Sequence, residues 1–384
     1  MQWVGDIGAE KMRAAAGLTR AATRAHPENL NAWLSLGRML LDLGDYEEAV
    51  AALRDAAAAI PDAIDLRLAL IRALMVQDRF EDALAQIEAA QALAPDDARL
   101  RQLYFSAATA AEVLDSALLE SDEAKAALSA TPALMFNLAQ RLGPEGALRM
   151  CDAQLLREPA HTNAKYLKAL ALAELGRGDE ASALIGLDRR VTMEELPCPG
   201  GHDSAEAFRA ALARDIIANP TLMRDPRSRT TRQGRQTRQL RQPGAAAVET
   251  LLAQFRQAVD ARIAEMDSAD DFARGRPEKG RLNAWAVVCG PEGRQLSHRH
   301  AGAWLSGVFY VAGARPAGEN AYRGALVLGI LNPKDHAFEP PWGIRHIEPV
   351  PGRLVMFPSY MPHATEPTHT AGERISVAFD VVPA

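Results

Sequence analysis

The sequence predicts a multi-domain protein of the α plus β class, with an N-terminal stack of helices and a C-terminal domain of short β-strands. A 34-residue period runs through the first half of the chain, whereas apolar segments with strand-like alternation run through residues 281–384. With 384 residues, 48% of them hydrophobic, the chain can bury a core in each domain. We expect the boundary between residues 187 and 188.

Prolines, alanines and large apolar residues recur at equivalent positions of this period. The recurring sets are Pro27, Pro61 and Pro95; Ala15, Ala49 and Ala83; Tyr46 and Phe80; Leu53 and Ile87; and Ala56 and Ala90. Small residues let paired helices pack closely and a proline ends the second helix, which is the pattern of tetratricopeptide-type repeats. Trp33 and Gly37 begin the best-defined unit, and Ala147 and Ala181 resume the period after a slip in register. We therefore expect about five units over residues 1–187, the outer ones degenerate.

A helical solenoid of this kind has no chemistry of its own, so its expected role is to hold another molecule. A peptide, a partner protein or a second copy of this chain would each suit such a surface. The charge of the predicted helices is mixed, and no residue of a groove stands out. A second interpretation, in which the repeats only support the C-terminal domain, stays open.

Residues 188–280 are expected to form a loop and helical extension of the second domain. Hydrophobic periodicity predicts helices over residues 205–217 and 246–266. Residues 224–241 contain seven arginines and one aspartate, which raises the question of nucleic-acid binding. No aromatic residues interrupt this run and the chain has a net charge of −6, so we favour a loop that contacts carboxylates or solvent.

Three histidines of the C-terminal domain are candidates for one metal site. His298 and His300 share a predicted strand, where residues two apart point to the same face. His363 follows the apolar run of residues 354–357, at a strand end where a neighbouring loop can admit substrate. Imidazoles aimed at one point indicate a metal. The remaining histidines of this domain, expected as exposed loop residues, are His336, His346 and His369.

The last predicted strand has a polar face that suits the lining of a cavity. Ile375, Val377, Phe379 and Val381 alternate with a second set of residues, which consists of Arg374, Ser376 and Asp380. The guanidinium of an arginine can grip a carboxylate through two parallel hydrogen bonds, and a serine hydroxyl adds one more. Tyr310 and Trp304 share the parity of His300, so either ring lines the same cavity or packs in the core.

These motifs together resemble the iron(II)/2-oxoglutarate dioxygenases. The resemblance lies in His-x-His before a strand that begins at Trp304, a Gly-x-Leu-Val-x-Phe-Pro strand that ends at His363, and Arg-x-Ser eleven residues later. More narrowly, the chain is similar to a group of bacterial oxygenases fused to helical repeats, over about residues 195–384. Residues 231–237 also resemble the stretch that precedes the barrel in that group, which places them in the C-terminal domain.

The resemblance implies a double-stranded β-helix, or jelly roll, over residues 281–384, with the metal and the cosubstrate in its open mouth. By position, the residues implied to hold iron(II) are His298, His300 and His363. Those implied to hold 2-oxoglutarate are Arg374 and Ser376, to which we add Tyr310 as a further candidate. In this family, oxidative decarboxylation of 2-oxoglutarate is coupled to the oxidation, most often the hydroxylation, of a second substrate.

One departure from the commonest pattern of the family concerns the third metal ligand. The usual set is two histidines and a carboxylate, and the carboxylate stands two residues after the first histidine. Here His300 occupies that position, so three neutral imidazoles would leave the metal more positive than usual. Either His300 binds the metal, or it only lines the site and water is the third ligand.

The identity of the second substrate stays open at this level. The repeats favour a peptide or a protein, by analogy with prolyl and aspartyl hydroxylases that carry helical repeats. A small-molecule hydroxylase is one alternative, and a cupin-like metal-binding or scaffold protein without oxygenase activity is another.

The composition favours a cytoplasmic protein with no membrane partner. Three widely spaced cysteines argue against a disulfide framework and for a reducing compartment. No apolar run approaches the roughly 18 residues of a membrane span. The first six residues lack the basic and apolar parts of a signal peptide.

Overall fold

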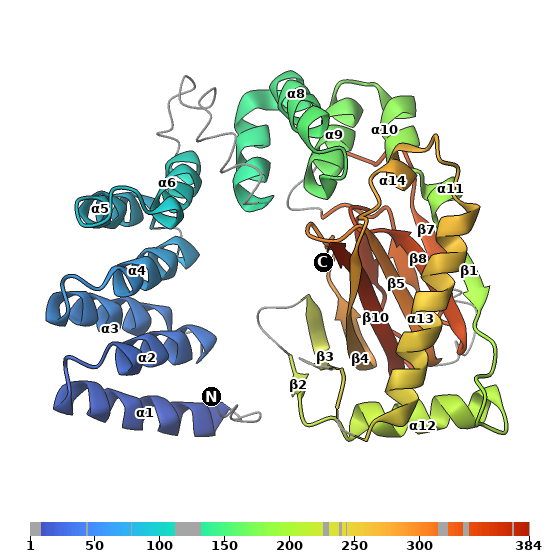
Figure 1. The fold of residues 1–384 in the computed structure, drawn as a ribbon, viewed down its shortest axis with the longest axis horizontal. Helices are drawn as coiled ribbons and strands as arrows, with labels where there is room; N and C mark the ends of the chain where they lie inside the picture. The colour runs from blue at the N-terminus through green and yellow to red at the C-terminus, as the bar shows by residue number, and fades with distance from the viewer. Residues whose placement is uncertain are drawn as a thin grey trace. The chain divides into compact units, whose positions relative to one another are not determined.

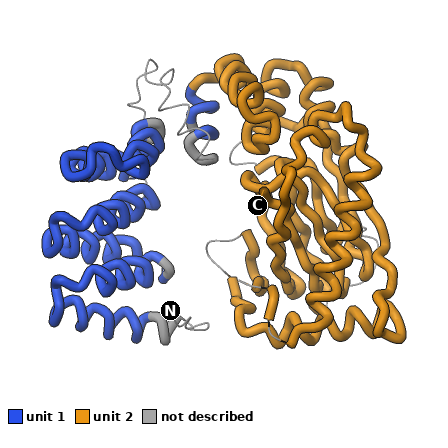
Figure 2. The backbone as a smooth tube through the Cα atoms, viewed as in Figure 1, with its two compact units in different colours: residues 1–141 blue, residues 142–384 orange. Residues whose placement is uncertain are grey.

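The computed structural model describes residues 9–43, 45–77, 79–111, 132–225, 230–237, 240–242, 244–313, 322–332, 338–370 and 372–383. The chain forms two compact units, residues 1–141 and residues 142–384 (Figure 2). The division falls within helix α8 (Pro132–Arg157), where Gly143 has a φ of 64° and interrupts the helical backbone. The boundary expected between residues 187 and 188 lies inside the second unit. Helices α9 (Thr162–Glu174) and α10 (Gly178–Ile185), expected among the repeats, belong to that second unit.

The first unit is a stack of helices in which each helix packs on the next along the chain. The helices are α1 (Ala9–Ala25), α2 (Leu30–Leu43), α3 (Tyr46–Ala59), α4 (Ile64–Val76), α5 (Phe80–Gln91) and α6 (Ala98–Ala110). The recurring alanines Ala49 and Ala83 are fully buried, as the period predicts. A Cβ added at Gly37 would approach the side chain of Leu53 to 2.7 Å, so glycine lets α2 and α3 pack closely. The predicted helical repeats are confirmed.

The second unit contains two antiparallel sheets (Figure 1). The larger has the strand order β1-β8-β5-β10-β4-β3-β2 and the smaller the order β7-β6-β9. The strands are β1 (Thr192–Glu195), β2 (Leu222–Arg224), β3 (Thr231–Thr237), β4 (Gly280–Gln295), β5 (Leu305–Ala312), β6 (Leu326–Leu328), β7 (Arg345–Ile347), β8 (Arg353–Pro358), β9 (His363–Thr365) and β10 (Arg374–Pro383). This arrangement confirms the predicted jelly roll.

Helix α13 (Ala246–Glu265) lies across one face of the larger sheet (Figure 1). Its Phe255 packs on Phe379 of β10, with ring centroids 4.4 Å apart, and on Phe309 of β5, at 6.2 Å. The apolar face predicted for residues 375–381 therefore meets α13. The polar face of the same strand is left for the interior of the jelly roll.

The extension over residues 188–280 holds more than the predicted loop and helices. Helices α12 (Ala205–Ile217) and α13 match the prediction closely. Three strands were missed: β1 pairs with β8 at one end of the larger sheet, while β2 and β3 complete its other end against β4. Among the described residues, no helix combines the length and the apolarity needed to cross a bilayer.

We expect Gly307→Ala to destabilise the C-terminal domain by about 1–3 kcal/mol, because overpacking of a core costs that much. Gly307 pairs with Phe379 across β5 and β10, and an added Cβ would overlap the ring of Phe379 that packs on α13. Thermal unfolding of the full chain measures the loss. Gly200→Ala is the control, since no atom lies within 4 Å of a Cβ built there. Equal melting temperatures for both variants would contradict the prediction.

Candidate metal and cosubstrate site

Three histidines from two segments of the chain converge at one end of the jelly roll. The backbone amide of His298 donates to the carbonyl of His363, and the backbone amide of His363 donates to the carbonyl of His298, both at 2.9 Å. His300 donates its amide to the carbonyl of Ser359, also at 2.9 Å. One ligand atom of each of the three rings lies within 4.8 Å of the other two. The strand predicted over residues 298–300 is wrong, because β4 ends at Gln295 and only one bridge forms, yet the imidazoles meet as predicted.

Each imidazole is oriented through its Nδ1 atom. The Nδ1 of His298 lies 2.7 Å from the carbonyl oxygen of Leu296, and that of His363 lies 3.0 Å from the carbonyl oxygen of Met361. A carbonyl oxygen can only accept, so both rings carry their proton on Nδ1 and keep the lone pair of Nε2 for a metal. The ring centroids of His298 and His363 are 4.2 Å apart, and each is 5.1 Å from that of His300.

The two carbonyl-bound histidines are held in the neutral form. Burial, together with the neighbouring imidazole of His300, lowers the pKa of His298 to about 3. Burial and both other imidazoles hold the pKa of His363 well below its ordinary value. A neutral imidazole is the form that binds a metal, so the site is ready to accept a cation at neutral pH.

These lowered pKa values predict that the metal-free protein loses stability on mild acidification. Between a pKa of about 3 in the folded state and about 6.5 in the unfolded state, the unfolded chain binds more protons, so the free energy of unfolding falls as the pH falls through this window. For two such histidines the expected loss between pH 7 and pH 5 is roughly 2–4 kcal/mol. Urea unfolding with a chelator present measures it.

The control for this pH dependence is the double variant His298→Gln with His363→Gln. It removes both titrating groups and leaves all other carboxylates and histidines in place. The difference in free energy between the two proteins should therefore shrink as the pH is lowered from 7 to 5. A constant difference would show that neither histidine has a lowered pKa.

His300 has a carboxylate where the other two rings have a carbonyl. Its Nδ1 lies 2.6 Å from Oδ1 of Asp380, a buried residue of β10. Ser306 donates to the same carboxylate oxygen at 2.7 Å, and its hydroxyl lies 2.8 Å from that of Ser359. The strand alternation placed Asp380 on the polar face but gave it no role. The two serines were not anticipated, although Ser306 is the residue that pairs with Asp380 across β5 and β10.

Arg374 is buried in the same interior and has no carboxylate partner among the described residues. Its Nη1 donates to the carbonyl oxygens of Gly324 and Glu366, at 2.7 Å and 3.0 Å, and its Nη2 donates to the hydroxyl of Thr365 at 3.0 Å. Thr365 belongs to β9, two residues after His363, so this strand connects the guanidinium to the histidine cluster. A buried charge that meets only neutral acceptors is suited to an external anion.

Tyr310 adds an unpaired hydroxyl to this part of the interior. Its ring is 2% exposed, and its hydroxyl has no hydrogen-bond partner in the part of the chain that the structure describes. Burial raises the pKa of the phenol to about 12, against the opposing effect of the Arg374 charge. Tyr310 pairs with Ser376 across β5 and β10. A buried donor without an acceptor is costly, and a carboxylate bound at Arg374 would supply that acceptor.

The residues present therefore fit both groups that the sequence implies. Three imidazoles leave open positions on a first-row metal, as an oxygenase needs. An uncompensated guanidinium and a hydroxyl without a partner fit the far carboxylate of 2-oxoglutarate.

Several other sequence candidates lie outside this arrangement. Trp304 stacks on Phe272, with ring centroids 5.0 Å apart, and donates its indole N–H to the carbonyl of Phe272, so it is a core residue. Trp285 was not anticipated, and its ring centroid lies 5.4 Å from that of His300. His346 is exposed but belongs to β7 and not to a loop. His336 lies outside the described residues.

Two arginines of the run contact carboxylates, as we expected, whereas Arg232 donates to the backbone carbonyl of Thr231. Arg235 pairs with Glu373 at 2.7 Å, and Arg241 pairs with Glu249 at 3.4 Å. Both pairs are substantially exposed, so they contribute little to stability.

Comparison with known proteins gives a family for each half of the chain. Residues 283–380 match the family described as "Putative 2OG-Fe(II) oxygenase", and residues 7–64 and 40–104 match tetratricopeptide repeat families. The C-terminal domain is thus a 2-oxoglutarate-dependent dioxygenase domain that uses iron(II), and the N-terminal region carries tetratricopeptide repeats. Both resemblances are confirmed. A search of curated proteins finds no match.

Among solved structures, a prolyl-4-hydroxylase from Pseudomonas putida is similar at 18% identity and a TM-score of 0.35, over 53% of this chain and 99% of that one. HygX from Streptomyces hygroscopicus, with nickel and 2-oxoglutarate bound, is similar at 11% identity and a TM-score of 0.36, over 50% of this chain and 83% of that one. A tetratricopeptide repeat protein from Parabacteroides merdae is similar at 14% identity and a TM-score of 0.36, over 46% of this chain and 72% of that one.

Proposed function

We propose that the oxygenase domain hydroxylates a side chain of a peptide or protein, with the tetratricopeptide repeats aiding the binding of that substrate or of a partner. In this proposal iron(II) is held by His298, His300 and His363. The far carboxylate of 2-oxoglutarate is held by Arg374, Ser376 and Tyr310. The observation that carries the proposal is the convergence of three imidazoles in the same jelly roll as a buried guanidinium that meets no carboxylate among the described residues.

When bound, the iron supplies the oxidation of a C–H bond at the expense of 2-oxoglutarate and dioxygen. The protein's own contribution is binding and orientation. The planar fork of Arg374 fixes the direction of the cosubstrate, and the hydroxyl of Tyr310 donates to the same carboxylate. The ring of Phe357, 4.9 Å from that of His363, forms an apolar wall that helps to exclude water.

We propose further that His300 is a metal ligand. In place of the usual ligand carboxylate, Asp380 would act on the metal indirectly, through its hydrogen bond to His300. A carboxylate hydrogen-bonded to Nδ1 makes an imidazole a more basic ligand and fixes its orientation. The Nδ1 of His300 and Oδ1 of Asp380 are 2.6 Å apart, which supports such a pairing. The negative charge then compensates the metal without occupying one of its coordination positions.

Asp380→Asn is expected to weaken iron(II) binding by about 10–100-fold, because loss of a residue that hydrogen-bonds to a metal ligand costs that much. The amide keeps the volume and one acceptor oxygen but removes the charge. Anaerobic titration with iron(II) measures the affinity. Glu373→Gln is the control, because this exposed carboxylate pairs with Arg235 and lies outside the histidine cluster, so the variant should bind iron normally. Unchanged affinity in Asp380→Asn would identify His300 as a residue that only lines the site.

The polypeptide substrate is supported by the repeats. Stacked helix pairs present extended surfaces that suit a chain in an extended conformation. We also propose a cytoplasmic location, which rests on the small number and wide spacing of the cysteines.

The first experiment is anaerobic addition of iron(II) and 2-oxoglutarate to the full chain. A visible charge-transfer band at stoichiometric binding is the expected result. Succinate production is then measured with a peptide library and, in parallel, with a collection of small metabolites. Stimulation by peptides alone supports the proposed substrate class, whereas stimulation by metabolites alone overturns it. Failure of both ligands to bind would remove the oxygenase proposal altogether.

A further inference from the structure

Helix α9 packs its first turn into the second unit and not toward solvent. Residues 162–166 are all buried, including the polar residues Thr162, Asn163 and Lys165. Polar side chains are rarely buried without a specific partner. Thr162 and Asn163 contact the segment that holds His298 and His300, whereas Lys165 belongs to an ion-pair cluster that leads to the loop before His363.

The first segment is Arg299–Ala301, which includes His300 and begins directly after His298. Nη2 of Arg299 donates to Oδ1 of Asn163 at 2.7 Å. The same guanidinium lies over the ring of Tyr166, 4.2 Å from its centroid. Thr162 donates its hydroxyl to the carbonyl of Ala301. These contacts fix the backbone on both sides of His300 against the helix.

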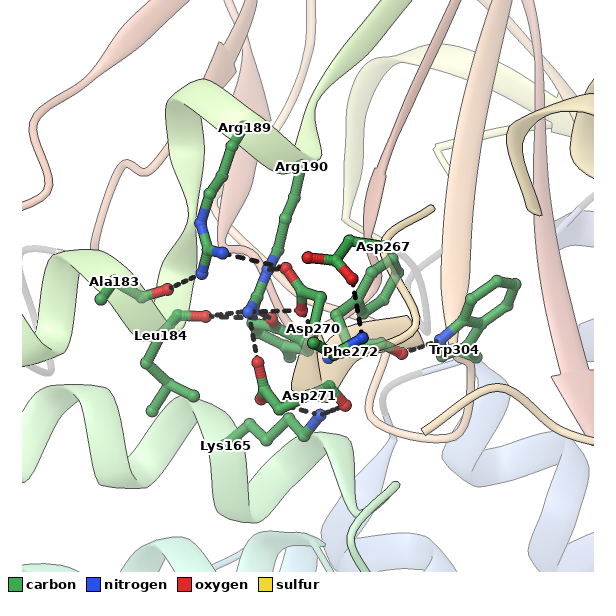
Figure 3. Close-up of polar contacts among 12 residues, drawn as sticks. Lys165, Ala183, Leu184, Arg189, Arg190, Asp267, Asp270, Asp271, Phe272 and Trp304 are labelled. Carbon is green, nitrogen blue, oxygen red and sulfur yellow. Dashed lines mark hydrogen bonds and ion pairs between the residues drawn. The ribbon is translucent and has the colours of Figure 1, made fainter. Parts of the chain in front are cut away.

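The second connection begins at Lys165 (Figure 3). Its Nζ donates to the carbonyl oxygen of Asp271 at 3.1 Å and lies 3.3 Å from the carboxylate of the same residue. Arg190 of α11 (Leu187–Arg190) pairs with this carboxylate and, at 2.8 Å, with that of Asp270. Asp270 caps the short helix α14 (Asp271–Arg274) by accepting from the amide of Phe272. The two buried cations therefore pair with two partly exposed carboxylates, and the charges of the cluster neutralise one another.

This cluster ends at Tyr360, a fully buried residue of the loop between β8 and β9. Arg190 donates to the hydroxyl of Tyr360, which in turn donates to the carbonyl of Leu184 at 3.0 Å. Nζ of Lys165 also lies 5.8 Å from the centroid of the Tyr360 ring. The helix therefore reaches this loop both through the ion pairs and directly.

Tyr360 lies between two residues whose carbonyl groups contact His300 and His363. The carbonyl of Ser359 accepts the amide of His300, and the carbonyl of Met361 lies 3.0 Å from Nδ1 of His363. Anchoring the Tyr360 side chain fixes the backbone between these two carbonyls. A shift of this loop would move the contact to the backbone of His300 and the contact to the imidazole of His363 at once.

We infer that α9 positions the metal site, by holding the His298–His300 segment through Thr162 and Asn163 and the Ser359–Met361 loop through Lys165, Arg190 and Tyr360. The inference rests on the proposed function, because it concerns the same three histidines. Buried ion pairs add little net stability compared with apolar residues of the same shape, whereas they specify one geometry. The residues of α9 are then positioning residues of the oxygenase site and not part of a partner-binding repeat.

The test uses the full chain with Thr162→Val, Tyr360→Phe and both together. Each substitution removes one hydroxyl and keeps the size of the side chain. Ser182→Ala is the matched control, because that hydroxyl bonds only within α10, to the carbonyl of Gly178. Cobalt(II), which resembles iron(II) and has a geometry-sensitive visible spectrum, is the probe. We expect about 3–10-fold weaker cobalt binding for each single variant, below the 10–100-fold loss for direct partners of ligands, with a larger loss and an altered spectrum for the double variant.

Cobalt affinity within twofold of the wild type and an unchanged spectrum in all three variants would overturn the inference, even if their melting temperatures fell. Should Thr162→Val not fold, Arg299→Lys tests the same connection, since it keeps the charge but loses the fork that meets Asn163 and Tyr166. If the wild-type chain binds neither cobalt nor iron, the proposed metal site itself is refuted. This outcome is distinct from a failure of the inference about α9.

Discussion

Replacing His298 or His363 with alanine is expected to weaken iron(II) binding by more than about 100-fold, beyond the cost of losing an outer-shell partner, and to stop succinate production. Each variant leaves at most two imidazoles to hold the metal. The iron that 2-oxoglutarate is proposed to chelate is then bound too weakly. The loss at His363 should be the larger. Its ring is buried, and its removal also leaves the carbonyl of Met361 without the donor that it has in the folded chain.

Anaerobic titration with iron(II), followed by the visible band on addition of 2-oxoglutarate, measures both steps separately. His346→Ala is the matched control, because this histidine is exposed in β7 and lies outside the cluster. His300→Ala completes the series. A loss comparable to that of His298→Ala identifies a third protein ligand, whereas unchanged affinity assigns the third position to water. Wild-type iron binding by the His298 and His363 variants would refute the site.

The helical repeats were predictable because their signal is local and repeated. An alanine that must be buried between two helices recurs at every unit, so Ala49 and Ala83 reveal the packing without knowledge of the fold. Helix α12 was predictable for the same reason, from one apolar face over residues 205–217. Strands β1 and β2 carry no comparable signal. Residues 192–195 are mostly exposed and form a strand only because β8 offers them an edge.

The convergence of the three histidines was predictable from their order and spacing, but the residues that support them were not. Asp380 orients His300 across 80 residues of sequence, and Arg190 meets Tyr360 across 170. Such contacts exist only after the sheets have formed, so a linear pattern does not reveal them. Helix α9 shows the same limit. Its period marks it as one more repeat, whereas it lies in the second compact unit and buries a polar first turn there.

Arg374→Met is expected to weaken 2-oxoglutarate binding by about 100-fold or more, because removing one partner of a buried charge pair costs 2–5 kcal/mol. Iron(II) affinity without cosubstrate should change little, since no hydrogen bond joins Arg374 to the histidines. Arg374→Lys keeps the charge but loses the planar fork, so an intermediate affinity is expected. Isothermal titration of the metal-loaded protein under nitrogen measures each value. Arg177→Met is the control, because that exposed arginine pairs with Glu180 at 2.7 Å within the same unit of the chain.

Tyr310→Phe separates binding from folding in this part of the interior. In the free protein the Tyr310 hydroxyl is buried without a partner, so its removal should leave the melting temperature equal or higher. In the complex that hydroxyl donates to the carboxylate held by Arg374, so its removal should weaken 2-oxoglutarate about tenfold, the equivalent of one hydrogen bond to a charged group. A purely structural role would lower stability and leave affinity intact, which is the opposite pair of changes. Arg374→Met should also weaken 2-oxoglutarate binding, so the two variants together show whether the buried guanidinium and hydroxyl act on one ligand.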